Sequence, residues 1–121
     1  TMLAIEGCIR PILEKEPMEC FFYFCPEKLK LNQHQDLTQE EFGILVNMFK
    51  QVYDELQIDE INETETTLQD TSCEVKGSYR LQARAGIETC MLAGNWTVYL
   101  EKQLTTECFY IVGVEIAGID F

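Results

Sequence analysis

Basic residues are scarce in this chain of 121 amino acids, in which 9 Lys and Arg stand against 21 Asp and Glu. The formal net charge of -12 argues against binding to a nucleic acid, because that binding depends on Lys and Arg contacts to phosphates. No apolar run approaches the ~18 residues of a membrane-spanning helix, so we expect no transmembrane segment. Phosphate-binding glycine loops and the G-x-S-x-G and H-E-x-x-H motifs are also absent from the sequence.

The composition is that of a globular protein. Hydrophobic residues make up 46% of the chain and charged residues 25%, and neither value suggests disorder or a fibrous protein. A chain of this size buries roughly two thirds of its unfolded surface, which is enough for one core. No linker, internal repeat or low-complexity segment divides it. We therefore predict a single α+β domain over residues 1–121.

The clearest local pattern predicts a helix over residues 37–57. Thr38 is a favourable N-cap residue, and Glu41 three positions later completes a capping box. Apolar residues then recur at spacings of three and four, which is typical of one buried helix face. That face comprises Phe42, Leu45, Phe49, Val52 and Leu56, widened by Met48 and Tyr53. We expect it to pack on a sheet.

Alternating apolar and polar residues predict antiparallel strands in the second half of the chain. Residues 73–84 alternate without a break. The next strand begins at residue 88 and either turns at Gly94-Asn95 or continues to residue 101. A last strand covers residues 107–116. Its expected inner face is Cys108, Tyr110, Val112, Val114 and Ile116.

The N-terminal third gives weaker signals. Residues 18–25 are rich in aromatics and predict a central strand that is covered on both faces. Residues 3–13 fit either a strand or a helix, and Gly7 and Pro11 favour the strand. The expected fold class is therefore α+β, with one long amphipathic helix packed on a mostly antiparallel sheet of about five strands.

Six cysteines leave two compartments open. In a small secreted domain this number suggests disulfides, and glycosylation sequons at Asn62 and Asn95 point the same way. However, Cys73, Cys90 and Cys108 fall in phase with apolar residues of their predicted strands, as reduced cysteines do. We expect a cytoplasmic protein, with secretion as the alternative. Because no C-x-x-C occurs and no His lies near a Cys, we expect no metal and no cofactor.

Acidic residues are concentrated between Lys50 and Lys76, an interval without a single Lys or Arg. The segment does not match a calcium-binding EF-hand, since Ile61 stands where a ligand belongs and no Gly makes the turn. It forms either an ordinary solvated face or a surface for a basic partner. The residues predicted to bind such a partner are Asp54, Glu55, Asp59, Glu60, Glu63 and Glu65.

Catalytic residues are not evident. His34 is the only histidine, and a lone histidine in a polar loop is more often solvated than catalytic. Lys76, Arg80 and Arg84 lie on one exposed strand face, where we expect ion pairs with Glu88, Glu101 and Glu115. A pocket inside a curved sheet is the remaining hypothesis for a ligand site. It would be lined by Phe22, Tyr79, Trp96 and Tyr110.

The leading functional hypothesis is a small acidic interaction domain that binds a basic partner protein and inhibits or regulates it. Immunity proteins and anti-defence proteins are acidic single domains of this kind, and the comparison is one of analogy. The alternatives are a secreted, disulfide-stabilised binding module with a cystatin-like arrangement and a small cone-shaped ligand-binding domain. We expect neither an enzyme nor a nucleic-acid or membrane partner. The apolar C-terminal strand would permit a homodimer if it lay at a sheet edge.

Overall fold

The computed structural model describes residues 4–103 and 108–121, and it shows an α+β fold with one helical layer on one curved sheet. The helical layer consists of η1 (Ile5–Ile9), α2 (Arg10–Leu13) and α3 (Gln39–Gln51). Six strands in the order β2-β1-β6-β5-β4-β3 form the sheet. They are β1 (Leu29–Leu31), β2 (His34–Leu37), β3 (Glu55–Leu68), β4 (Ser72–Ala85), β5 (Glu88–Lys102) and β6 (Phe109–Ile116).

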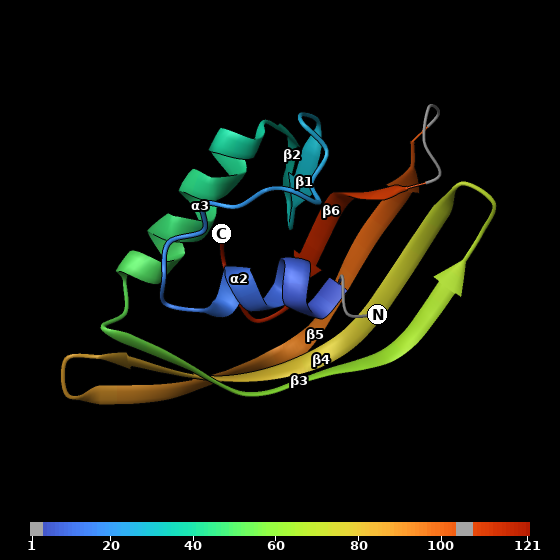
Figure 1. The fold of residues 1–121 in the computed structure, drawn as a ribbon. Coiled ribbons are helices and arrows are strands. Elements are labelled where there is room, and N and C mark those ends of the chain that lie inside the picture. The colour runs from blue at the N-terminus through green and yellow to red at the C-terminus, as the bar shows by residue number, and fades with distance from the viewer. Residues whose placement is uncertain (1–3, 104–107) are drawn as a thin grey trace.

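The three long strands β3, β4 and β5 curve beneath the helices (Figure 1). Two aromatic residues on their inner face stand opposite glycines, with Trp96 paired to Gly77 and Tyr79 paired to Gly94. A Cβ atom at Gly77 would lie 2.3 Å from Cζ2 of Trp96 and 1.9 Å from the carbonyl oxygen of Asn62. Gly77 therefore makes room for the Trp96 ring at the bend of the sheet, whereas a Cβ atom at Gly94 would lie 2.6 Å from the carbonyl oxygen of Ala117.

The core lies between this inner face and the helices. From the helical layer it receives the buried side chains of Ile9, Ile12, Phe42 and Val46, and from the sheet those of Val75, Leu81, Val98 and Val114. This arrangement confirms the predicted fold class, with six strands in place of about five. None of the helices in the described ranges is long and apolar enough to cross a membrane.

The main helix α3 begins where the sequence predicts. The Thr38 hydroxyl accepts the Glu41 N–H at 3.1 Å, and the Glu41 carboxylate accepts the Thr38 N–H at 2.9 Å. The predicted end is wrong, because the helix stops at Gln51 and not at Gln57. From Glu55 onward the backbone pairs with β4 instead, and sheet hydrogen bonds replace helical ones. Met48 and Val52, which were expected to be buried, are exposed, because they lie on the side of α3 that faces away from Phe42, Val46 and Phe49.

The N-terminal third differs most from the prediction. Residues 5–13 form helices, and Pro11 occupies the first turn of α2, where its missing N–H does no harm. Residues 18–25 form no strand and contribute one isolated bridge, between Phe24 and Ile111. Two of their aromatic residues, Phe21 and Phe24, pack edge-to-face with each other and with Phe42 of α3.

The later strands agree better with the sequence. β4 matches residues 73–84 closely, and β5 runs through Gly94 without turning. In β6 the alternation shifts at Val112, because Gly113 pairs with Tyr99 while Ile111 pairs with Leu100. Tyr110 and Val112 are consequently half-buried rather than inward-facing. β6 also lies between β1 and β5, so the edge position on which a homodimer through this strand depended is not found.

Candidate interaction surface

The acidic segment forms the edge of the sheet. Its residues were expected in a helix end and a loop, but Glu55, Asp59, Glu60, Glu63 and Glu65 belong to strand β3, and Asp54 directly precedes it. One side of β3 pairs with β4, and no described strand pairs with the other side. The sequence signal for this strand is short, since Leu56 and Ile58 alternate but the pairing shifts between Ile58 and Glu60.

The register between β3 and β4 sets acidic residues opposite basic ones. Glu60 pairs with Arg80 and Glu55 with Arg84, while Glu65 stands opposite Lys76. The Arg80 guanidinium lies 3.3 Å from the Glu60 carboxylate, and that of Arg84 lies 3.2 Å from Glu55. The two guanidinium groups of β4 therefore form ion pairs with carboxylates of β3.

The carboxylates expected to meet those cations lie elsewhere. Glu88 pairs with Ala85 and Glu101 with Ser72 in the register of β4 and β5. Glu115 lies 3.7 Å from Lys30 and accepts a hydrogen bond from the Tyr99 hydroxyl. That bond, together with burial, raises the pKa of Tyr99 to about 12.

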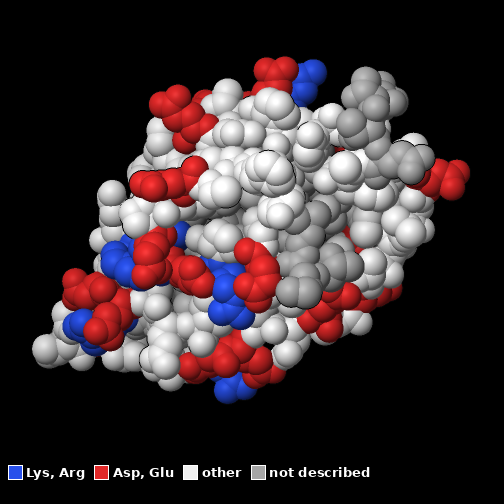
Figure 2. Space-filling model, in the orientation of Figure 1, with Lys and Arg blue, Asp and Glu red and all other residues white. Residues whose placement is uncertain are grey.

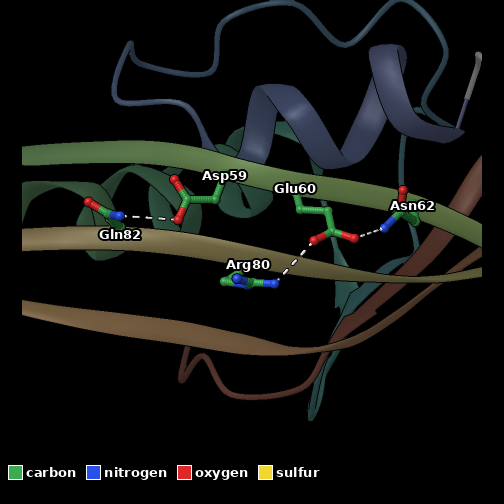
Figure 3. A network of polar contacts seen from close by, with 5 residues as sticks. All are labelled: Asp59, Glu60, Asn62, Arg80 and Gln82. Atoms are coloured by element: carbon green, nitrogen blue, oxygen red, sulfur yellow. Dashed lines mark hydrogen bonds and ion pairs between the residues drawn. The ribbon is translucent and has the colours of Figure 1, made fainter.

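Polar contacts continue along the outer side of the two strands (Figure 3). The Gln82 amide donates to the Asp59 carboxylate at 3.1 Å, and Glu60 also accepts a hydrogen bond from Asn62. At the start of β3, the Asp54 carboxylate accepts the Gly86 N–H at 2.7 Å and lies 3.7 Å from Arg84. The side chains of the acidic edge are thus positioned by their neighbours.

Negative charge remains in excess on this edge. Of the six predicted residues, Asp54, Glu55 and Glu60 contact the guanidinium groups of Arg80 and Arg84, and the interval between Lys50 and Lys76 adds no Lys or Arg of its own. The hydrogen bond to Glu55 raises the pKa of Arg84, so this cation stays charged. Figure 2 shows one face of the molecule, where the basic groups lie beside acidic ones and carboxylates predominate.

The four aromatic residues predicted to line a pocket are separated. Tyr79 and Trp96 are buried neighbours in the core. The Tyr79 hydroxyl donates to the Ala117 carbonyl at 2.6 Å, and burial raises its pKa to about 12. Phe22 is 77% exposed and stacks edge-to-face on Tyr23. Tyr110 lines a surface hollow of about 510 Å³ on which none of the other three borders.

The single histidine and the cysteines form no metal or catalytic cluster among the described residues. The His34 ring lies 2.6 Å from the Phe121 carbonyl oxygen. Cys8 is a buried thiol whose pKa is raised by burial, and Cys20, Cys25, Cys73 and Cys90 are also free thiols. Among the described residues no group of three or more His, Cys, Asp or Glu side chains could hold a metal ion.

Lys50 is a buried charged residue that the sequence pattern did not reveal. Its side chain is 2% exposed, and its Nζ donates to the carbonyl oxygens of Pro11 and Glu16 at 2.6 Å each. The Lys15 ammonium donates in return to the Lys50 carbonyl at 2.9 Å. Burial lowers the pKa of Lys50 to about 8, although Glu14 and Glu16 raise it in part. This amine joins α3 to the end of α2.

Comparison with known proteins identifies the fold and nothing narrower. No family model and no curated protein sequence matches this chain. Among solved structures, a Kribbella flavida protein aligns with a TM-score of 0.72 at 9% identity and covers 94% of this chain and 85% of its own. A nuclear transport factor 2 (NTF2-like) superfamily protein from Salmonella enterica aligns with a TM-score of 0.67 at 14% identity over 98% and 87%.

A third structure, a DUF4783 family protein from Bacteroides uniformis, has a TM-score of 0.57 at 14% identity and covers 96% of this chain and 97% of its own. Identities this low show the fold alone. The chain therefore has an NTF2-like fold, in which one main helix packs on a curved, mostly antiparallel sheet. Because one fold carries many functions, the function has to be argued from the residues described above.

Proposed function

We propose that this protein is an acidic interaction domain that binds a basic partner protein through strand β3 and inhibits or regulates it. The observation that carries the proposal is the position of the carboxylates. Five of the six lie on one edge strand whose outer backbone groups pair with no described strand. An edge strand offers backbone hydrogen bonds to a partner, and its side chains select which partner can use them.

Charge on β3 favours a basic partner over a second copy of this chain. Two copies that met edge to edge would bring two rows of carboxylates together, and like charges on neighbouring strands are destabilising. Bulges near Asp59 and Thr64 also interrupt the regular edge, a feature that protects natural edge strands from self-pairing. A partner strand or loop rich in Lys and Arg would instead be attracted by the carboxylates of β3.

The ion pairs within the sheet do not prevent such binding. The paired side chains of Glu55, Glu60, Arg80 and Arg84 keep between 39% and 70% of their surface exposed. Exposed pairs are worth at most about 1 kcal/mol each. A partner can therefore compete for the carboxylates, and the net charge of -12 would speed its approach.

The test compares two variants of equal charge. The edge variant carries Asp59→Asn, Glu60→Gln, Glu63→Gln and Glu65→Gln. The control carries Glu19→Gln, Glu27→Gln, Glu101→Gln and Asp120→Asn, which are exposed residues outside β3. Each set removes four negative charges. Circular dichroism and thermal unfolding establish that both variants fold.

Immobilised protein is used to capture partners from a lysate of its own source, and each captured protein is then purified. Association is measured at about 50 mM and about 300 mM salt, since screening over this range weakens exposed charge interactions. We expect a basic partner whose association slows at least tenfold in high salt and in the edge variant, but not in the control. Equal association by the two variants, or an acidic partner, would contradict the proposal.

A further inference from the structure

The outward face of α3 carries an apolar ridge. Ile44, Met48 and Val52 follow one another at intervals of four residues, and they are 52%, 58% and 65% exposed. Because a helix turns once in 3.6 residues, side chains at this spacing form one continuous row. The opposite face of α3 buries Phe42, Val46 and Phe49, so the core does not need the ridge.

Carboxylate side chains lie at both ends of the ridge. Glu40 occupies the same row one turn before Ile44, and Asp54 and Glu55 follow Val52 where the chain passes into β3 (Figure 1). The distance along the helix from residue 44 to residue 52 is about 12 Å at 1.5 Å per residue. An apolar strip of that length with negative charge at both ends has a definite complement, which is an apolar strip with positive charge at both ends.

Another exposed apolar residue, Ile87, lies in the turn that contacts Asp54 after the Val52 end of the ridge. The Asp54 carboxylate accepts the Gly86 N–H at 2.7 Å, so the turn between β4 and β5 is held beside the end of α3. Ile87 in that turn is fully exposed. The Asp54 carboxylate therefore lies between the end of α3 and this turn, where the acidic edge β3 begins.

We infer that the outward face of α3 is a docking surface for a basic amphipathic helix of the partner protein. The occupant would pack apolar side chains at positions i, i+4 and i+8 against Ile44, Met48 and Val52, as ridges pack between two helices. Its Lys or Arg side chains would lie against Glu40 at one end and against Asp54 and Glu55 at the other. This inference rests on the proposed function, since it specifies a second contact for the same basic partner.

The other occupants of an exposed apolar ridge are less well matched. A second copy of this chain would bring the same carboxylates against themselves at the ends of the ridge. Met48 contributes a flexible thioether side chain, which adapts to differently shaped apolar partners. The match of charge at both ends of the ridge is therefore what selects a basic helix.

The experiment uses a designed peptide as the probe. The peptide has 18 residues, with Leu at i, i+4 and i+8 of one face, Lys in its first and last turns, and Ala and Gln elsewhere to favour the helix. A scrambled peptide of the same composition distributes Leu around the helix. Binding to the full chain is measured by fluorescence anisotropy. The ridge variant carries Ile44→Ser, Met48→Ser and Val52→Ser, and the matched control carries Leu68→Ser, an exposed apolar residue of β3.

We expect the amphipathic peptide to bind at least tenfold more tightly than the scrambled peptide. The ridge variant should lose at least tenfold in affinity, and Leu68→Ser should lose less than twofold. Equal affinity of wild type and ridge variant overturns this inference. If the partner captured on β3 still binds that variant unchanged, the proposed function survives. If the edge variant of β3 binds the captured partner as tightly as the wild type does, the proposed function is wrong, whatever the peptide binds.

Sedimentation velocity adds a second readout. If the wild type forms a concentration-dependent dimer and the ridge variant does not, the ridge binds a second copy of this chain. In a separate assay, binding to neutral phosphatidylcholine vesicles that the ridge variant loses would show that the ridge binds a membrane. Either result overturns the inference of a basic helix.

Discussion

The buried Lys50 gives this protein a pH dependence of stability that one substitution can remove. Its folded-state pKa of about 8 lies below the ordinary value of 10.5, because burial disfavours the charged amine. Between these values the unfolded chain holds a proton that the folded chain does not, so stability rises with pH. The contribution is complete above 10.5 and is lost as pH falls through 8.

The size of the effect follows from the two pKa values. Between about pH 7 and about pH 9.5 the linkage relation gives a gain of about 2 kcal/mol in the free energy of unfolding. The Lys50 amine can lose its third proton without losing either hydrogen bond, because a neutral amine still has two N–H groups for Pro11 and Glu16. The neutral form is therefore fully accommodated at this position.

Urea unfolding at the two pH values measures this gain. Trp96 is the only tryptophan and is 1% exposed, so its fluorescence reports loss of the core. In Lys50→Met the gain should disappear, although overall stability falls because the carbonyls of Pro11 and Glu16 lose a donor. The exposed Lys76→Met should keep the wild-type gain. Other titrating groups contribute equally to all three proteins, so parallel pH profiles for wild type and Lys50→Met would refute the reasoning.

Four further substitutions test the fold. Gly77→Ala places a methyl group 1.9 Å from the backbone oxygen of Asn62 and 2.3 Å from Trp96, and it should cost at least about 1–3 kcal/mol and shift the tryptophan emission. Gly113→Ala, whose nearest contact would be 3.4 Å, should cost clearly less, and equal costs would contradict this account of the bend. Thr38→Ala removes the cap of α3 and should lower the urea midpoint by an amount equivalent to about 1 kcal/mol. Asn32→Ala breaks hydrogen bonds to the Ile116 N–H and the Ile119 carbonyl and should cost about 2 kcal/mol, whereas a cost near zero would show that these bonds are replaced by water.

Features set by neighbouring residues could be predicted from the sequence. The start of α3 depends on Thr38 and Glu41, which contact each other within one turn, so the predicted capping box is confirmed to the residue. The strand β4 is predicted to within a residue at each end, because its inner and outer residues alternate for its whole length. In both cases the residues that form the sequence pattern are also the residues whose local contacts set the element.

Features set by distant partners could not be predicted. α3 ends early because Glu55 pairs with Arg84, a residue far along the chain, and helical periodicity through Leu56 gave no warning of it. β3 and β6 each change phase at a bulge, and a bulge depends on the register with the neighbouring strand. The candidate surface followed the same rule. Its six acidic residues were recognisable, but their arrangement on one sheet edge beside Arg80 and Arg84 was not.

The same distinction separates what the fold supplies from what this chain adds to it. Structures at 9–14% identity share the curved sheet and its main helix, yet identity this low cannot preserve a particular set of side chains. At the centre of that sheet this chain places Trp96 and Tyr79, whose polar atoms already bond to backbone carbonyls of Ser78 and Ala117. The carboxylates of β3 and the apolar ridge of α3 lie outside the core and are not needed to build it. Residues that the core does not require are free to serve binding, and for that reason the functional proposals rest on these two surfaces.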